Sequence, residues 1–205
     1  MTIAFMSGWS RRALVGAFAT LAVVGLLLTA CSGDEGNTAG GEATQTIVEA
    51  NGADVMFAQM MIPHHEQAVV MADLATDRAA DPQLLDLAAQ IKSAQEPEIE
   101  LMASWLKEWG QPQLEGHEAM MSHGSHGMQG MLSDDQLDAL ASASGATFDA
   151  LFAEYMIEHH EGAVAMANDV LAQGSNPDVA QLAQAIIVTQ EEEIEQLRSF
   201  LSTSP

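Results

Sequence analysis

The chain has 205 residues and carries 29 acidic against 6 basic side chains, for a formal net charge of −23. A surface this acidic repels nucleic acid and anionic lipid head groups and favours cations, so we exclude a nucleic-acid partner. The single cysteine, Cys31, excludes an intramolecular disulfide, and the length suits one domain with a substantial core.

Residues 1–30 have the composition of an export signal. Arg11 and Arg12 precede an apolar stretch that is too short for a comfortable membrane span. The stretch ends in Leu28-Thr29-Ala30-Cys31, which resembles the lipobox of bacterial lipoproteins. We therefore expect lipidation at Cys31 and export to the bacterial envelope, with contact to the cell membrane through the lipid anchor only. An ordinary signal peptide is the alternative, and the paired arginines leave Sec or twin-arginine export open.

The rest of the chain divides by composition. Residues 31–46 are small, polar and acidic, which is typical of a flexible tether. Helical periodicity covers 47–110 and returns over 134–205, while 111–133 is rich in Gly, His, Met and Ser. No alternating β-branched runs occur, so the sequence predicts an all-α domain over 47–205.

An internal repeat organises this domain. Asp54–Ala72 aligns without a gap to Asp149–Ala167, 95 residues later, with 12 of 19 positions identical. The following helices repeat as well, from expected starts at Asp81-Pro82 and Asn176-Pro177. Each unit is thus a helical hairpin, and two such hairpins should pack as a four-helix bundle.

A helical wheel places the positions that the two copies share on one face of the first helix, which should be the core face. That face carries His64 and His65, repeated as His159 and His160. Methionines flank each pair on the same helix: Met61 and Met71 in the first copy, Met156 and Met166 in the second. Imidazole and thioether together suit soft or borderline metals, copper(I) above all, so we expect these side chains to bind copper. The alternative is that methionine fills core gaps while the histidines form a buried polar network.

Four further residues are expected to support this site. Gln95 and Gln190 lie within the apolar stripe of the second helix of each hairpin, so each needs a hydrogen-bond partner, and a neighbouring histidine is the expected one. Glu98 and Glu193 lie at the edge of that stripe. Glu66 and Glu161 are repeated too, but the wheel turns Glu66 away from the core, so their role is not assigned.

The segment between the hairpins is a second expected metal-binding element. It concentrates ligand-type side chains within a Gly- and Ser-rich stretch: His117, Met120, Met121, His123, His126, Met128 and Met131. Short histidine-rich tracts are typical of metal binding, and the mixture with methionine favours copper over zinc. A hinge of biased composition is the alternative.

Two other functions stay open. The acidic bundle could be a non-metal module that docks a partner protein in the envelope or a second copy of the chain. A di-iron redox enzyme needs Glu-x-x-His on two helices, but Met61 and Met156 stand three residues before His64 and His159. The sequence offers no candidate for nucleophilic catalysis and no phosphate-binding loop, so we expect a binding protein and not an enzyme.

The doubled motif Met-Ile-x-His-His-Glu, at 61–66 and 156–161, resembles the secreted bacterial proteins grouped as domain of unknown function 305. The resemblance covers about residues 46–203. It implies a ferritin-like four-helix fold, and some members are associated with copper binding and copper tolerance. When the motif positions of the family are transferred to this chain, the implied ligands are His64, His65, His159 and His160 with Met61 and Met156.

Overall fold

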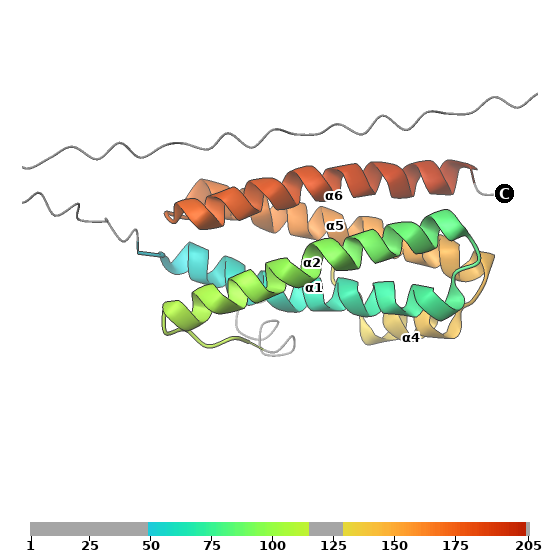
Figure 1. Cartoon of the computed structure of the whole chain (residues 1–205), viewed down its shortest axis with the longest axis horizontal. Helices are drawn as coiled ribbons and strands as arrows, with labels where there is room; N and C mark the ends of the chain where they lie inside the picture. The colour runs from blue at the N-terminus through green and yellow to red at the C-terminus, as the bar shows by residue number, and fades with distance from the viewer. Residues whose placement is uncertain (1–48, 115–128, 204–205) are drawn as a thin grey trace, which may run out of the picture. The chain divides into compact units, whose positions relative to one another are not determined.

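The computed structural model describes residues 49–114 and 129–203. These residues form α1 (Gly52–Arg78), α2 (Pro82–Glu108), α4 (Asp134–Ser142), α5 (Ala146–Gln173) and α6 (Pro177–Thr203) (Figure 1). The fold is all-α, as the sequence predicted. Within the described ranges, no helix is long and apolar enough to cross a membrane.

Polar caps fix where three of the four long helices begin: α1, α2 and α6. Asn51 and Asp54 form a capping box at the start of α1, in which each side chain accepts a hydrogen bond from the other residue's backbone N–H. The side chains of Asp81 and Asn176 accept from backbone N–H groups in the first turns of α2 and α6. Both predicted Asx-Pro helix starts are confirmed.

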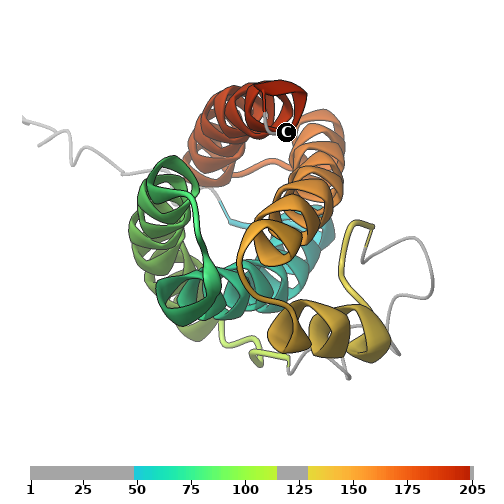
Figure 2. The same cartoon turned by 90° about the vertical axis from the view of Figure 1, so that its right-hand side faces the viewer.

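The four long helices form two antiparallel hairpins that pack as a bundle. Helix α1 packs along α2 and α5 along α6, while α1 and α5 join the hairpins and α2 and α6 touch little. The end-on view in Figure 2 shows the four helices around a common centre, with α4 outside the bundle beside α1 and α5. A break in the helical backbone after Ser142 makes α4 a separate short helix, and Gly145 adopts a positive φ of 62° there.

Two repeat-related aspartates tie the hairpins together. Asp54 of α1 is fully buried and accepts hydrogen bonds from the backbone N–H groups of Ser175 and Asn176, between α5 and α6. Asp149 of α5 accepts in the same way from Ala80 and Asp81, between α1 and α2. Each hairpin therefore holds the turn of the other, which fixes the register of α1 against α5.

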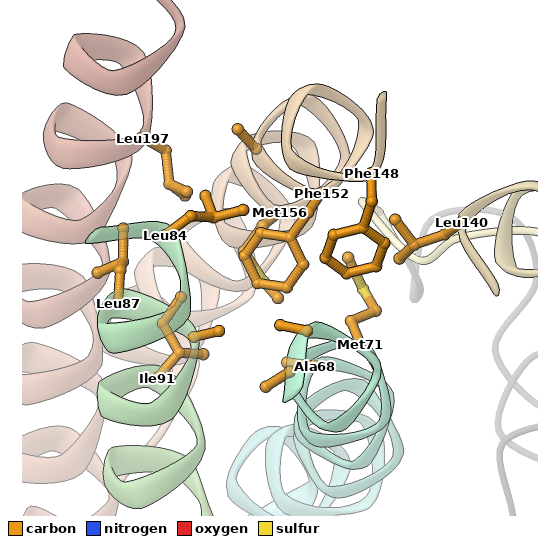
Figure 3. Close-up of a cluster of buried hydrophobic side chains, with 14 of the residues drawn as sticks. Ala68, Met71, Leu84, Leu87, Ile91, Leu140, Phe148, Phe152, Met156 and Leu197 are labelled. Atoms are coloured by element: carbon orange, nitrogen blue, oxygen red, sulfur yellow. The ribbon is translucent and has the colours of Figure 1, made fainter. Parts of the chain in front are cut away.

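The apolar core consists of two clusters along the bundle. One, shown in Figure 3, takes Ala68–Ala75 of α1 and Phe148–Met156 of α5. The other takes Phe57–Ile62 of α1 and Ala163–Val170 of α5. On both helices the histidine pair lies between the two clusters, so the core is interrupted at mid-bundle by a polar layer.

Candidate metal centre

The four motif histidines meet in that polar layer. All four are fully buried, at 0% exposure. His64 of α1 and His159 of α5 lie against each other across the hairpin interface, with ring centroids 3.8 Å apart and planes tilted by 39°. The sequence-predicted core position of these residues is thus confirmed.

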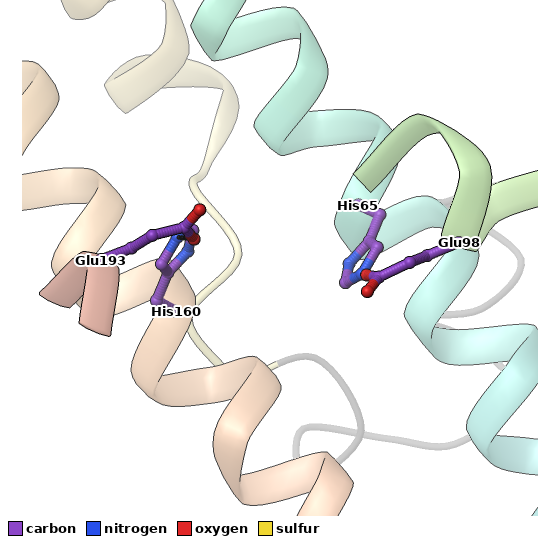
Figure 4. A network of polar contacts seen from close by, with 4 residues as sticks. All are labelled: His65, Glu98, His160 and Glu193. Carbon is purple, nitrogen blue, oxygen red and sulfur yellow. Dashed lines mark hydrogen bonds and ion pairs between the residues drawn. The ribbon is translucent and has the colours of Figure 1, made fainter. Parts of the chain in front are cut away.

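The other two histidines each bind a carboxylate of their own hairpin. His65 Nε2 lies 2.7 Å from Oε2 of Glu98 on α2, and His160 Nε2 lies 2.7 Å from Oε2 of Glu193 on α6 (Figure 4). Both pairs span 33 residues, so they are repeat-related. The sequence places both glutamates at the edge of the apolar stripe and does not by itself assign them to the site. The equal spacing in both copies was the available signal.

The backbone of residues 129–132, the described end of the segment between the hairpins (called the link below), provides a hydrogen-bond acceptor for His64. Its Nε2 donates to the Gln129 carbonyl at 3.1 Å. The link is held from α1 by Gln67, whose amide donates to the Leu132 carbonyl at 3.0 Å and accepts from the Leu132 N–H at 2.7 Å. Gly162 of α5 lies directly beneath it, since a Cβ there would be 1.8 Å from the Gln129 carbonyl oxygen. The absent side chain at Gly162 therefore allows the link to cover the His64–His159 pair.

Five imidazole nitrogens of this layer have no hydrogen-bond partner. They are Nδ1 of all four histidines and, in addition, Nε2 of His159. Burial, followed by the nearby His65, lowers the pKa of His64 from 6.5 to about 3. Burial likewise lowers the pKa of His159 well below 6.5, with the neighbouring His64 as the next cause. These two rings are therefore neutral at physiological pH and present uncharged lone pairs in the interior.

The predicted methionines lie on both sides of the histidine layer. Met61 and Met166 belong to one core cluster, and Met71 and Met156 belong to the other. Met61, Met71 and Met156 are fully buried, while Met166 is half-buried. Each cluster thus contains one methionine from α1 and one from α5.

Of the four residues expected to support the site, the two glutamines are buried and the two glutamates are exposed. Gln95 and Gln190 are buried, but both amide atoms of Gln95 and Oε1 of Gln190 lack a partner. The predicted hydrogen bond between Gln95 and a histidine is therefore wrong, since Glu98 takes His65 instead. Glu66 and Glu161 are exposed, and Glu161 pairs with Arg198 at 2.7 Å on the surface.

The expected lipidation site Cys31 lies outside the described residues. So do six of the predicted loop ligands: His117, Met120, Met121, His123, His126 and Met128. Among the residues that the structure does describe, no three His, Cys, Asp or Glu side chains are grouped so that they could hold a metal ion. An ion in the histidine layer would therefore need thioether ligands or a rotation of the imidazole rings.

Comparison with known proteins places these features in a family context. The profile described as Domain of unknown function (DUF305) matches residues 54–201. A DUF305 protein structure from Streptomyces coelicolor is 31% identical, with a TM-score of 0.67, and the match covers 73% of this chain and 92% of that one. A DUF305 fragment from Deinococcus radiodurans is 32% identical, with a TM-score of 0.65, covering 76% and 99%.

A third similar structure is CopM in its Cu(I)-bound form. It is 34% identical, with a TM-score of 0.60, and the match covers 73% of this chain and 95% of CopM. CopM has also been solved in Cu(II)-bound and Ag-bound forms. The curated proteins contain no match to this sequence.

Proposed function

The chain belongs to the family described as Domain of unknown function (DUF305), and from this premise we propose that it is a copper-binding protein of the bacterial envelope. It holds the ion in the layer formed by His64, His65, His159 and His160. Its role is to sequester or buffer copper outside the cytoplasm, and it is not an enzyme.

The observation that carries the proposal is the set of buried imidazole nitrogens without partners. A buried polar atom that lacks a hydrogen bond costs about 1–3 kcal/mol, so five such atoms in one layer are expensive for a structural core. Because the pKa values of His64 and His159 are lowered, each of these two rings carries only one proton at neutral pH and keeps one nitrogen lone pair free. A metal cation would be bound by these nitrogen lone pairs.

The choice of copper follows from the softness of the available ligands. Met61 and Met156 lie three residues before His64 and His159 on the same helices and are fully buried. Thioether sulfur favours Cu(I), and imidazole accepts copper in either oxidation state. The solved forms of CopM carry Cu(I), Cu(II) and Ag, which supports a soft-metal site in this chain.

The cellular location is part of the same proposal. The relative from Streptomyces coelicolor carries the description of a secreted protein in its name, which supports export of this chain. We propose that Cys31 is lipidated and anchors the domain to the membrane. The loop histidines and methionines between His117 and Met128 would capture the ion or pass it on.

The test is a competition titration of the purified protein against a Cu(I) chelator, with Cu(II) measured by calorimetry. We expect binding tighter than about micromolar, roughly −8 kcal/mol, and its loss in the His65→Asn/His160→Asn variant. Replacing His117, His123 and His126 by Asn should leave that affinity in place. Absence of such binding in the wild type would contradict the function, and loss only in the loop variant would contradict the site.

One observation favours a protein-interaction module as a second function. Trp105 and Trp109 stack with centroids 5.9 Å apart beside a groove of about 680 Å³. Glu49, Glu108 and Asp178 also line this groove, which suits a basic side chain of a partner. Tryptophan fluorescence should then respond to an arginine-rich peptide at physiological salt, and an unchanged spectrum would count against this function.

A further inference from the structure

Three of the four histidines have the same ring nitrogen engaged. Nε2 of His65 faces the Glu98 carboxylate, Nε2 of His160 faces the Glu193 carboxylate, and Nε2 of His64 faces the Gln129 carbonyl. The three acceptors come from α2, α6 and the link before α4. Three separate segments, two of which are repeat-related, therefore engage the same ring nitrogen of three imidazoles.

An acceptor opposite Nε2 decides which tautomer the ring adopts. A neutral imidazole carries one N–H, so a ring that donates through Nε2 has a bare lone pair on Nδ1. The Nδ1 atoms of His64, His65 and His160 are buried and have no partner. Hence the acceptors select the form in which Nδ1 is the available donor atom for an ion.

We propose that Glu98 and Glu193 are positioning residues that commit His65 and His160 to bind the ion through Nδ1. The inference rests on the proposed copper function and deepens it. In protein metal sites a carboxylate behind a ligating histidine fixes the tautomer and ring orientation and raises the basicity of the ligand. The two pairs here have that arrangement on one side and an unpartnered nitrogen on the other.

Glu98 and Glu193 are more buried than the nearby glutamates on the same helices. Glu193 is 6% exposed and is the buried glutamate among the described residues, and the side chain of Glu98 is 19% exposed. Glu100 and Glu195, two residues further along the same helices, are exposed. Burying a carboxylate is costly unless it is hydrogen-bonded. A purely structural histidine–glutamate pair would explain the Nε2 contacts, but it leaves Nδ1 of both histidines unsatisfied in the core.

The first measurement is the tautomer of the histidines in the metal-free, full-length protein labelled with ¹⁵N-histidine. Long-range ¹H–¹⁵N spectra distinguish the Nε2–H form from the Nδ1–H form. We expect His65 and His160 in the Nε2–H form. Addition of Ag(I), which is diamagnetic, should then produce one-bond silver–nitrogen coupling at Nδ1. Finding the Nδ1–H form, or silver coupling at Nε2, overturns the inference.

The second measurement compares Glu98→Gln/Glu193→Gln with the matched control Glu100→Gln/Glu195→Gln. Both variants remove two charges from the same helices, but only the first places an amide, which can donate as well as accept, opposite Nε2 of His65 and His160. We expect the first variant to show mixed tautomers at His65 and His160 and to bind Ag(I) and Cu(I) about 10–100-fold more weakly. The control should match the wild type in both respects.

The outcomes separate the inference from the function on which it rests. Wild-type protein that binds neither Ag(I) nor Cu(I) refutes the copper function, and the inference with it. Binding that is unaffected by Glu98→Gln/Glu193→Gln, or that uses Nε2, refutes only the positioning role. Circular dichroism establishes that the variants are folded, and the tautomers of the wild type decide the question if they are not.

Discussion

Gly162 offers a sharp test of how the inter-hairpin link covers the histidine layer. A Cβ at this position would lie 1.8 Å from the carbonyl oxygen and 2.4 Å from the carbonyl carbon of Gln129, and 2.9 Å from the backbone nitrogen of Gly130. All three are backbone atoms, so no side-chain rotation relieves the overlap. In the Gly162→Ala variant the link must therefore move away from α5.

The expected loss of stability follows from the contacts that this movement breaks. Displacing Gln129 leaves the buried His64 N–H without its acceptor, which costs about 1–3 kcal/mol. The two hydrogen bonds between Gln67 and Leu132 are strained or lost, at about 0.5–1.5 kcal/mol each. Alanine favours the helix over glycine by about 1 kcal/mol and offsets part of this. We expect a net decrease of roughly 1–5 kcal/mol in the free energy of unfolding.

Urea unfolding of the metal-free protein, followed by circular dichroism, measures the difference. Gly52→Ala is the matched control, because it is also a glycine-to-alanine change in a long helix and its Cβ would meet nothing within 4 Å. The control should be as stable as the wild type or slightly more so. A Gly162→Ala variant that behaves like the control would refute the close seating of the link on α5.

Three further predictions concern the histidine layer, the clamps between hairpins and the choice of metal. Because the pKa of His64 is lowered to about 3, and that of His159 is also lowered, the unfolded chain binds more protons than the folded one below pH 6.5. The contribution of these two neutral histidines to the free energy of unfolding of the metal-free protein is therefore fully present above pH 6.5. It decreases as the pH falls, by about 2 kcal/mol from His64 alone between pH 6.5 and 5. A urea midpoint that stays constant over this range would contradict the burial of these histidines in the neutral form. Asp149→Ala leaves the backbone N–H groups of Ala80 and Asp81, in the turn between α1 and α2, without their carboxylate acceptor. It should lower the unfolding free energy by about 2–4 kcal/mol, whereas a calorimetric loss below about 0.5 kcal/mol would argue against the clamp. Met61→Leu/Met156→Leu conserves volume and should cost less than about 1.5 kcal/mol in stability, yet weaken Cu(I) binding more than Cu(II) binding, and equal effects on both ions would exclude thioether ligation.

The sequence predicted the framework of the site because the framework is periodic. A shared face on the first helix of each copy located His64 and His159 in the core, and the repeat itself predicted two hairpins in one bundle. A helical wheel describes directions on one helix and gives no rotation for the helix packed against it. For that reason the sequence predicts a contact between Gln95 and a histidine, whereas Glu98, about one turn further along α2, makes the contact.

The repeat could not predict the part of the site that differs between the two copies. The Gln129 carbonyl is a backbone group in a single-copy link, so no side-chain pattern indicates it. The one available signal was the exchange of Gln67 for Gly162 at equivalent positions. It reflects a physical difference, since the link hydrogen-bonds to the first residue and lies directly on the second.

The bundle also carries methionine where an iron-binding bundle would carry glutamate. Di-iron bundles take one Glu from each of two helices and Glu-x-x-His from the other two. Here α2 and α6 supply Glu98 and Glu193, but α1 and α5 supply Met61 and Met156 at the positions three before their histidines. Two soft, neutral and fully buried side chains thus stand where a di-iron bundle has two hard, charged ligands.

Such an exchange should shift the preference from iron to copper. The two remaining carboxylates are hydrogen-bonded to His65 and His160, so they orient ligands instead of neutralising a di-iron pair. Metal analysis of the protein purified from its native envelope should therefore find copper and no stoichiometric iron. Bound iron with a visible charge-transfer band would contradict this reasoning, because it would require more carboxylate ligands than Glu98 and Glu193, the two that contact histidines in the described part of the layer.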